Sequence, residues 1–348
     1  MAEDRRISHE DLKQLFYDAF TAVGAPDHVA RTESEIGAEV DLCGVHSHGV
    51  RLLTMMVENI QKGLTKADSE VAVVSEHQAS ALAETDCGLG RYVSAVAMDM
   101  AIERAETFGI GSVALRGAAH WGRAHSYAHR AARKGMLGIS CTNAVTNFPA
   151  WGTSVPSLGN NPIAIGIPGG EEDPVVMDLS MTRVAIGKIR DAADEGEKVP
   201  LGWGLDTDGN PTDDPAAIME SRRFLPMGDH KGSSLAFAIE LLTAGLSGGF
   251  LCHEMGQGGR PNDVAGGSSK LFIAMKPFGD WLPERVASLK AHLKAAPRAP
   301  EQGEAMWPGE GSFQRRDAYL KDGIPITPKL AADLDRLAED LGIEIRWM

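Results

Sequence analysis

The 348-residue chain lacks the features that mark several classes of protein. Its four cysteines are scattered and include no Cys-x-x-Cys pair, so the sequence indicates neither a zinc ribbon nor a disulfide framework. No apolar run reaches the length of about 20 residues that spans a membrane. The first residues lack the apolar region of a signal peptide, so we expect a cytoplasmic protein without a membrane partner.

Positive charge is also scarce. The chain has 34 lysines and arginines against 48 acidic residues, a formal net charge of −14, which argues against nucleic acid as a partner. The apolar fraction of 43% is that of an ordinary globular protein, and the length suggests roughly two domains.

The usual phosphate-binding motifs are missing although glycine is abundant. There is no Walker A sequence, and the best glycine fingerprint, Gly109-Ile-Gly-Ser-Val-Ala114, follows a predicted helix and enters a predicted strand. In a Rossmann domain the glycines lie between a strand and the following helix. A standard Rossmann domain is therefore not expected.

Periodicity predicts a helical head followed by a mixed α/β domain. Apolar stripes indicate helices over 8–24, 26–40 and 51–63. From residue 71 short strands alternate with helices, which predicts an α/β (α+β) fold with a mixed sheet over about 71–235. A late strand over 271–275 and helices over 283–295 and 328–341 complete the chain.

The densest chemistry lies in the run Asp41 to Met55, where His46, Ser47 and His48 stand between two glycines. Imidazole exchanges its proton near neutral pH, which makes it the usual acid or base in catalysis. These residues are therefore the first candidates for a catalytic site.

A second imidazole cluster contains His120, His125 and His129. His120 follows a strand and precedes a helix, a position typical of site residues, although a capping or packed histidine fits the spacing equally well. The other two are one helical turn apart, but no third ligand accompanies them in the sequence. We expect a surface helix there and no metal site.

Two further segments have features of ligand binding. Asp178 to Thr182 ends a strand with a carboxylate and hydroxyls, which suits ribose or a carboxamide but equally suits a helix cap. Lys231 precedes an apolar helix, where it either binds a phosphate or belongs to a solvated turn.

Taken in order, these segments resemble the malate/L-lactate dehydrogenase-like family of oxidoreductases, which includes ureidoglycolate, sulfolactate and diketogulonate enzymes and cyclic imino-acid reductases. The similarity runs along nearly the whole chain, through Gly44–Gly49, His120–Gly122, Thr142–Asn143, Trp151–Gly152, Leu158–Pro162, Asp178–Ser180, Gly187–Lys188, Pro200–Asp206, Gly209–Thr212, His230–Gly232 and Pro308–Glu310.

The resemblance implies an NAD- or NADP-dependent enzyme with a non-Rossmann fold, acting on a small carboxylate substrate. It implies a helical domain built from both chain ends (1–70 and 236–348), a mixed-sheet cofactor domain (71–235), and a homodimer or higher homo-oligomer. It assigns proton transfer to His48, with Ser47 and His120 as further catalytic residues. The expected cofactor contacts are Asp178, Leu179, Ser180, His230, Lys231, Pro308, Gly309 and Glu310.

The expected substrate contacts are Arg51, His120, Thr142 and Asn143. Two departures from the family pattern bear on them. His46 stands where the family often has aspartate, and Leu52 stands where many members have a carboxylate-anchoring arginine. A shift of one residue, to Arg51, turns a helical side chain by about 100°, so the substrate is not necessarily a plain 2-oxo acid.

The resulting hypothesis is hydride transfer between NAD(P)H and the carbon next to a carboxylate in a 2-oxo/2-hydroxy acid. One alternative is reduction of a cyclic imine such as pyrroline- or piperideine-2-carboxylate. Another, from a different class, is a metal-dependent hydrolase or lyase using His46, His48, His120 and His125.

Overall fold

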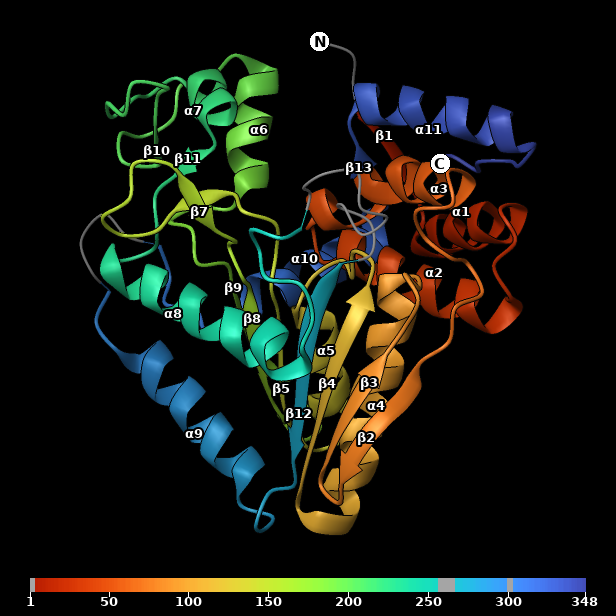
Figure 1. Cartoon of the computed structure of the whole chain (residues 1–348), viewed down its shortest axis with the longest axis vertical. Helices are drawn as coiled ribbons and strands as arrows, with labels where there is room; N and C mark the ends of the chain where they lie inside the picture. The colour runs from red at the N-terminus through yellow and green to blue at the C-terminus, as the bar shows by residue number, and fades with distance from the viewer. Residues whose placement is uncertain (1–3, 256–266, 299–302) are drawn as a thin grey trace.

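The computed structural model describes residues 4–255, 267–298 and 303–348, and its centre is a seven-stranded mixed sheet (Figure 1). Only the pair β3–β4 is parallel, and the other neighbours in the sheet are antiparallel. In spatial order the strands are β2 (Ala72–His77), β3 (Ser80–Glu84), β4 (Ile110–Ala118), β12 (Ser268–Met275), β5 (Leu137–Thr142), β8 (Ile163–Ile167) and β9 (Val175–Leu179).

The sheet has a hydrophobic core on each face. Successive side chains of a strand point to opposite faces, and on β4 Val113 and Leu115 belong to one core whereas Ala114 belongs to the other. In the same way, Phe272 and Leu271 of β12 point to opposite faces. Both faces are therefore covered, as Figure 1 shows.

Different helices cover the two faces. Helices α4 (Gly90–Phe108) and α5 (His125–Arg133) pack against β4, β5 and β8 in the larger core. Helix α8 (His230–Glu240) and the π-helical turn η3 (Leu241–Gly245) cover the opposite face. Helix α9 (Leu282–Ala295) follows β12.

Both ends of the chain build one helical part. Strand β1 (Arg5–Ile7) pairs antiparallel with β13 (Ile324–Ile326), which ties the two ends together. The helices of this part are α1 (His9–Ala22), α2 (Asp27–Leu42), α3 (Leu53–Gln61), α10 (Glu310–Asp322) and α11 (Pro328–Leu341), with the 3-10 turns η1 (His46–His48) and η2 (Val50–Leu52) between α2 and α3.

A smaller group of elements lies beyond β9. It consists of α6 (Ile186–Glu195), α7 (Pro215–Ser221) and the short strand pairs β10 (Gly204–Leu205) with β11 (Arg223–Phe224) and β6 (Phe148–Pro149) with β7 (Pro156–Leu158). Figure 1 shows α6 and α7 on the opposite side of the molecule from α1 and α11.

The structure confirms the α/β class with a mixed sheet and corrects one boundary. The predicted strand at 271–275 is β12, but it lies in the centre of the sheet between β4 and β5. The stretch 236–348 therefore does not return to the helical part as a block, because this strand pairs with two others over its length. No helix in the described ranges is both long and apolar enough to cross a membrane.

Candidate active site

A cleft of about 440 Å³ lies where the helical part meets the carboxyl end of β9. It is lined by Ser47 and His48 from η1 and by His120 and Arg123 from the segment between β4 and α5. The lining also includes Asp178, Ser180, Gly187 and Arg190. Segments far apart in the sequence thus converge on a single space.

The turn that carries His48 is shaped by the carboxylate of Asp41, at the end of α2. Its Oδ2 accepts a hydrogen bond of 2.6 Å from the backbone N–H of Val50. A Cβ at Gly49 would clash with this carboxylate, so glycine allows the close approach. The sequence therefore forms two short 3-10 turns here instead of one continuous helix.

Three polar side chains of the cleft lie close together. Ser47 Oγ is 2.9 Å from Nδ1 of His48, within hydrogen-bond distance, and the rings of His48 and His120 have centroids 6.0 Å apart. The backbone N–H of Gly122 donates to Nδ1 of His120 at 3.1 Å. Since Nδ1 of His120 accepts, the proton of its neutral ring is on Nε2, which is then a donor.

Burial keeps both rings neutral at ordinary pH. It lowers the pKa of His48 below its usual 6.5, while the nearby Asp178 carboxylate acts in the opposite direction. Burial, with the charges of His48, Arg91 and Lys270, lowers the pKa of His120 to about 3. The cleft thus pairs a histidine that titrates below neutral pH with one that stays uncharged.

A buried lysine lies beside His120. Lys270, in β12, donates hydrogen bonds to the backbone oxygen of Ala119 at 3.2 Å and to Ser268 Oγ at 2.8 Å. Its side chain is fully buried, and desolvation lowers its pKa to about 7. Sequence reasoning missed this residue, although a lysine at the start of an apolar strand is an unusual signal.

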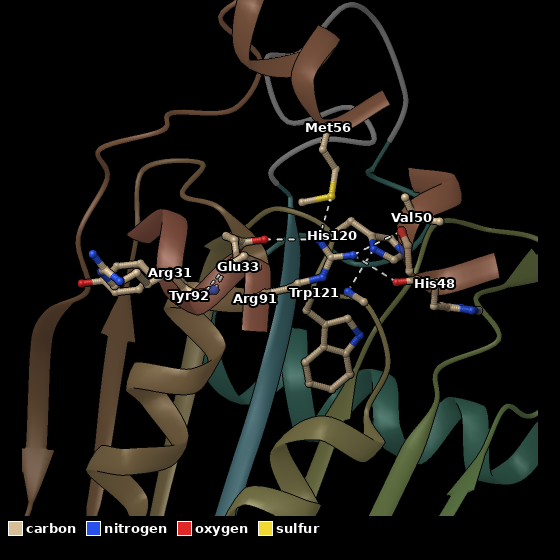
Figure 2. A network of polar contacts seen from close by, with 12 residues as sticks. Arg31, Glu33, His48, Val50, Met56, Arg91, Tyr92, His120 and Trp121 are labelled. Carbon is tan, nitrogen blue, oxygen red and sulfur yellow. Dashed lines mark hydrogen bonds and ion pairs between the residues drawn. The ribbon is translucent and has the colours of Figure 1, made fainter. Parts of the chain in front are cut away.

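A buried ion pair fixes the His48 turn from behind (Figure 2). Arg91, at the start of α4, lies 3.3 Å from Glu33 of α2, and both side chains are fully buried. The same guanidinium donates to the backbone oxygen of His48 at 3.1 Å, and the Glu33 carboxylate also accepts from the N–H of Tyr92 at 2.8 Å. This network connects the helical part, behind the candidate catalytic histidine, to α4, which packs against the sheet.

His46 and Arg51 point away from the cleft. Nδ1 of His46 donates to Asp41 at 2.9 Å, so the family departure at this position forms part of the turn's framework. The Arg51 guanidinium donates to Asp191 at 2.6 Å and lines a different cavity of about 520 Å³ that includes α11 residues. Leu52, in contrast, lines the His48 cleft.

The residues at the end of β9 do reach the cleft. Asp178 and Ser180 line it, and Asp178 Oδ2 accepts from Nε of Arg123 at 3.1 Å. Nη1 of Arg123 is buried and has no partner among the described residues. Leu179, between them, is more than one-third exposed and does not line the cleft.

The other expected cofactor residues lie beside this strand end, outside the cleft lining. His230 and Lys231 are exposed at the start of α8. The turn before this helix is held close to the end of β9, because the backbone N–H of Met227 donates a hydrogen bond of 2.8 Å to the backbone oxygen of Met181. Pro308 accepts from the N–H of Val176, within β9, at 3.1 Å.

Gly309 and Glu310 differ in which of their groups are free to contact a cofactor. Gly309 has a left-handed backbone and is the N-cap residue of α10. The Glu310 carboxylate is mostly buried and already accepts from Lys294 Nζ at 2.7 Å and from the Trp307 N–H at 3.2 Å. The Glu310 side chain therefore stabilises the start of α10. Only the backbone of residues 308–310 is left near β9 to contact a cofactor.

Thr142 and Asn143 are not brought to the cleft. Thr142 Oγ1 donates to the Ser269 backbone oxygen at 2.9 Å, and the Asn143 amide donates to Glu240 at 2.9 Å. Both are buried in contacts that join β5, β12 and α8. The polar groups of Thr142 and Asn143 are thus engaged in hydrogen bonds that stabilise the fold.

Two arginines of the cleft were missed by sequence reasoning. Arg123 lies three residues after His120 in the segment already singled out, so its proximity was available as a signal. Arg190 is on α6, and Gly187 on the same helix allows the close approach because a Cβ there would come within 3.0 Å of Ser47. Within the described ranges Arg190 has no hydrogen bond or ion pair. No sequence pattern predicts that an arginine will lack such a partner.

Comparison with known proteins gives matches along the whole length. The family model described as malate/L-lactate dehydrogenase matches residues 7–335. A malate/(S)-sulfolactate dehydrogenase from Methanothermus fervidus is 32% identical over 98% of this chain and 99% of the relative. A Δ1-pyrroline-2-carboxylate/Δ1-piperideine-2-carboxylate reductase from Pseudomonas putida is 29% identical, with 97% of each chain covered.

A solved structure shares the fold as well. The sulfolactate dehydrogenase from Methanocaldococcus jannaschii superimposes with a TM-score of 0.89, at 32% identity and with 98% of each chain covered.

Proposed function

Because the chain belongs to the malate/L-lactate dehydrogenase family, whose members are NAD(P)-dependent oxidoreductases, we propose that it transfers a hydride between a nicotinamide cofactor and the carbon next to the carboxylate of a small 2-oxo/2-hydroxy acid. The observation that carries the proposal is the cleft in which Ser47, His48 and His120 face the end of β9.

The residues around this strand end suit a dinucleotide. Asp178 and Ser180 have oxygens in the cleft that can accept hydrogen bonds from the cofactor. Nη1 of Arg123 is a buried donor without a partner in the described part of the chain, so it can donate a hydrogen bond to the cofactor. Lys231, exposed and without a partner in the described part of the chain, suits a phosphate at the start of α8. The cofactor, when bound, supplies or accepts the hydride.

The chain's own residues then handle the proton and the orientation. In reduction, protonated His48 donates a proton to the oxygen or nitrogen of the group that is reduced; in oxidation, neutral His48 accepts it. Ser47 orients His48 through its hydrogen bond to Nδ1. His120, neutral with a proton on Nε2, donates a hydrogen bond that orients the substrate.

Arg190 is the stronger candidate for the substrate's carboxylate. The predicted partner, Arg51, is occupied by Asp191 and lines only the other cavity. Arg190 lines both cavities, is unpaired in the described part of the chain and reaches the cleft with His48. A guanidinium can bind a carboxylate through two parallel hydrogen bonds. The anchor in our proposal is therefore Arg190, and Arg51 is the competing candidate.

Cyclic imine reduction is the second candidate function, and Leu52 favours it. This apolar side chain lines the cleft at the position where the resemblance puts arginine in many members. An apolar wall suits the methylene groups of a five- or six-membered ring better than a second carboxylate. A reductase that is named for these cyclic imines, from Pseudomonas putida, is 29% identical to this chain.

An assay panel tests both candidates. The purified protein is incubated with linear 2-oxo acids and, separately, with pyrroline- and piperideine-2-carboxylate, each with NADH and with NADPH, and cofactor absorbance is followed. The proposal expects turnover of a linear acid; turnover of cyclic imines alone would select the second function. No turnover with any pair would contradict both.

A further inference from the structure

A cluster outside the His48 cleft combines two imidazoles with a carboxylate. His125 and His129 stand one turn apart on α5, and Glu39 approaches them from α2. One potential ligand atom from each residue lies within 4.8 Å of those of the other two. The sequence showed no carboxylate near the histidines, because Glu39 is brought to them only by the packing of the two helices.

Two nitrogens of the cluster have no partner. Nε2 of His125 and Nε2 of His129 are buried without a hydrogen bond in the described part of the molecule. His125 is 1% exposed, so water does not satisfy its nitrogen freely. Burying a polar atom without a partner is unfavourable, which makes two such atoms in one cluster an unusual arrangement.

The side-chain types of the cluster suit a divalent cation. A neutral imidazole and an ionised carboxylate are the forms that bind metals.

One positive charge near the cluster, that of Arg123, has a carboxylate partner of its own. Nε of Arg123 pairs with Asp178, on the side of the cleft. Phe313 of α10 also packs against both imidazoles, with ring centroids 6.1 Å from His125 and 5.9 Å from His129. The aromatic ring restricts the orientation of both histidines, which reduces the entropy lost when they bind a ligand.

We propose that Glu39, His125 and His129 form a binding site for a divalent transition metal, with Zn²⁺ as the preferred ion. Two imidazoles and one carboxylate are a common zinc ligand set and leave a fourth position for water. Glu39 and His129 retain 30% and 16% of their side-chain exposure, so an ion has access from solvent. The bound metal joins α2 to α5, and thereby the helical part to the sheet.

The test uses the metal alone. The full-length protein is treated with a chelator, desalted, and titrated with Zn²⁺ by calorimetry, and with Co²⁺ as a spectroscopic probe of nitrogen and oxygen ligands. We expect one saturable site per chain and a higher Tm with Zn²⁺. Neither readout depends on catalytic activity, so the result is independent of the proposed function.

Three variants identify the ligands. Glu39→Gln, His129→Asn and His125→Gln should each weaken Zn²⁺ binding at least tenfold and abolish the Tm increase. His77→Asn, on the exposed strand β2, is the matched control and should bind as the wild type does. If His125→Gln does not fold, the two partly exposed positions still decide the question. The proposal is overturned by the absence of a one-per-chain site, or by unchanged affinity in Glu39→Gln and His129→Asn.

Discussion

Arg91 and His48 are joined by a hydrogen bond of 3.1 Å from the arginine guanidinium to the histidine's backbone oxygen. Arg91 is itself held by Glu33, so a fully buried ion pair determines where the candidate catalytic turn lies. Figure 2 shows Glu33, Arg91 and His48 along one line of contacts. A change at either charged residue should therefore affect both stability and catalysis.

Arg91→Met should lower the free energy of unfolding by roughly 3–5 kcal/mol, because it leaves the Glu33 carboxylate buried without its counter-charge. Chemical denaturation measures the change. Arg31→Met is the control, since it removes an exposed pair with Asp27 and should change the stability much less. Arg91→Met/Glu33→Gln should recover part of the loss, and no recovery would argue against the pair as the cause.

His48→Gln should lower kcat by roughly 10²–10⁴-fold, the range for loss of a general acid–base. Cofactor affinity, measured by fluorescence titration, should change little because the cofactor contacts proposed are near β9. His46→Asn, two residues away and bonded to Asp41, is the control and should lose much less turnover. Near-normal kcat in His48→Gln would remove this residue from the central role.

The pH dependence of oxidation should follow His48. Burial lowers its pKa below 6.5, so the neutral base is present at pH 7, and kcat/KM should stay level above 6.5 and fall on acidification below it. His120, with a pKa of about 3, contributes nothing in the range from 5 to 9.

Asp178→Asn should move the acidic limb of this profile to lower pH, because the Asp178 carboxylate raises the pKa of His48. The readout is the shape of kcat/KM against pH, normalised to each protein's own maximum. An unchanged limb, or one displaced to higher pH, would show that a different group is titrating.

Arg190→Gln should raise the KM for the carboxylate substrate by about tenfold or more, since a charge-assisted hydrogen bond contributes roughly 1.5–3 kcal/mol. Arg51→Gln is the matched variant and should change KM little, because Arg51 is occupied by Asp191. Steady-state kinetics on both proteins decides the matter; the reverse pattern would restore Arg51 as the anchor.

Lys231→Ala should weaken cofactor binding severalfold while leaving the folded structure intact, because the side chain is exposed and makes no hydrogen bond or ion pair in the described ranges. Calorimetric Kd values for NADH and NADPH measure the effect. Lys188→Ala, an exposed lysine on α6, serves as control. Equal Kd values in wild type and Lys231→Ala would place the phosphate elsewhere.

Local patterns predicted much of the fold. Ser8 caps α1 by accepting from the Asp11 N–H at 3.0 Å, and Leu12, Leu15 and Phe16 are buried as the helical stripe indicated. These features succeed because helix periodicity and capping depend on neighbours within one or two turns. The central position of β12 was missed because strand order depends on contacts between distant segments.

The candidate site was predicted only in part for the same reason. Ser47 and His48 are adjacent in the sequence, and their contact follows from that adjacency. The pairing of Arg51 with Asp191 joins residues 140 positions apart, and Glu39 reaches His125 and His129 from another helix. Sequence periodicity does not predict contacts between residues that are far apart in the chain.

The sequence by itself determined the class of fold, the absence of a Rossmann motif and the residues able to carry protons in a family-like order. Only the tertiary structure decided which of these residues share a cleft, that His46 and Arg51 face elsewhere, and that Arg190 is unpaired. The physical reason is that residue type sets the chemistry available to a side chain. Its protonation state and partners depend instead on burial and on charges contributed by segments that meet only when the chain folds.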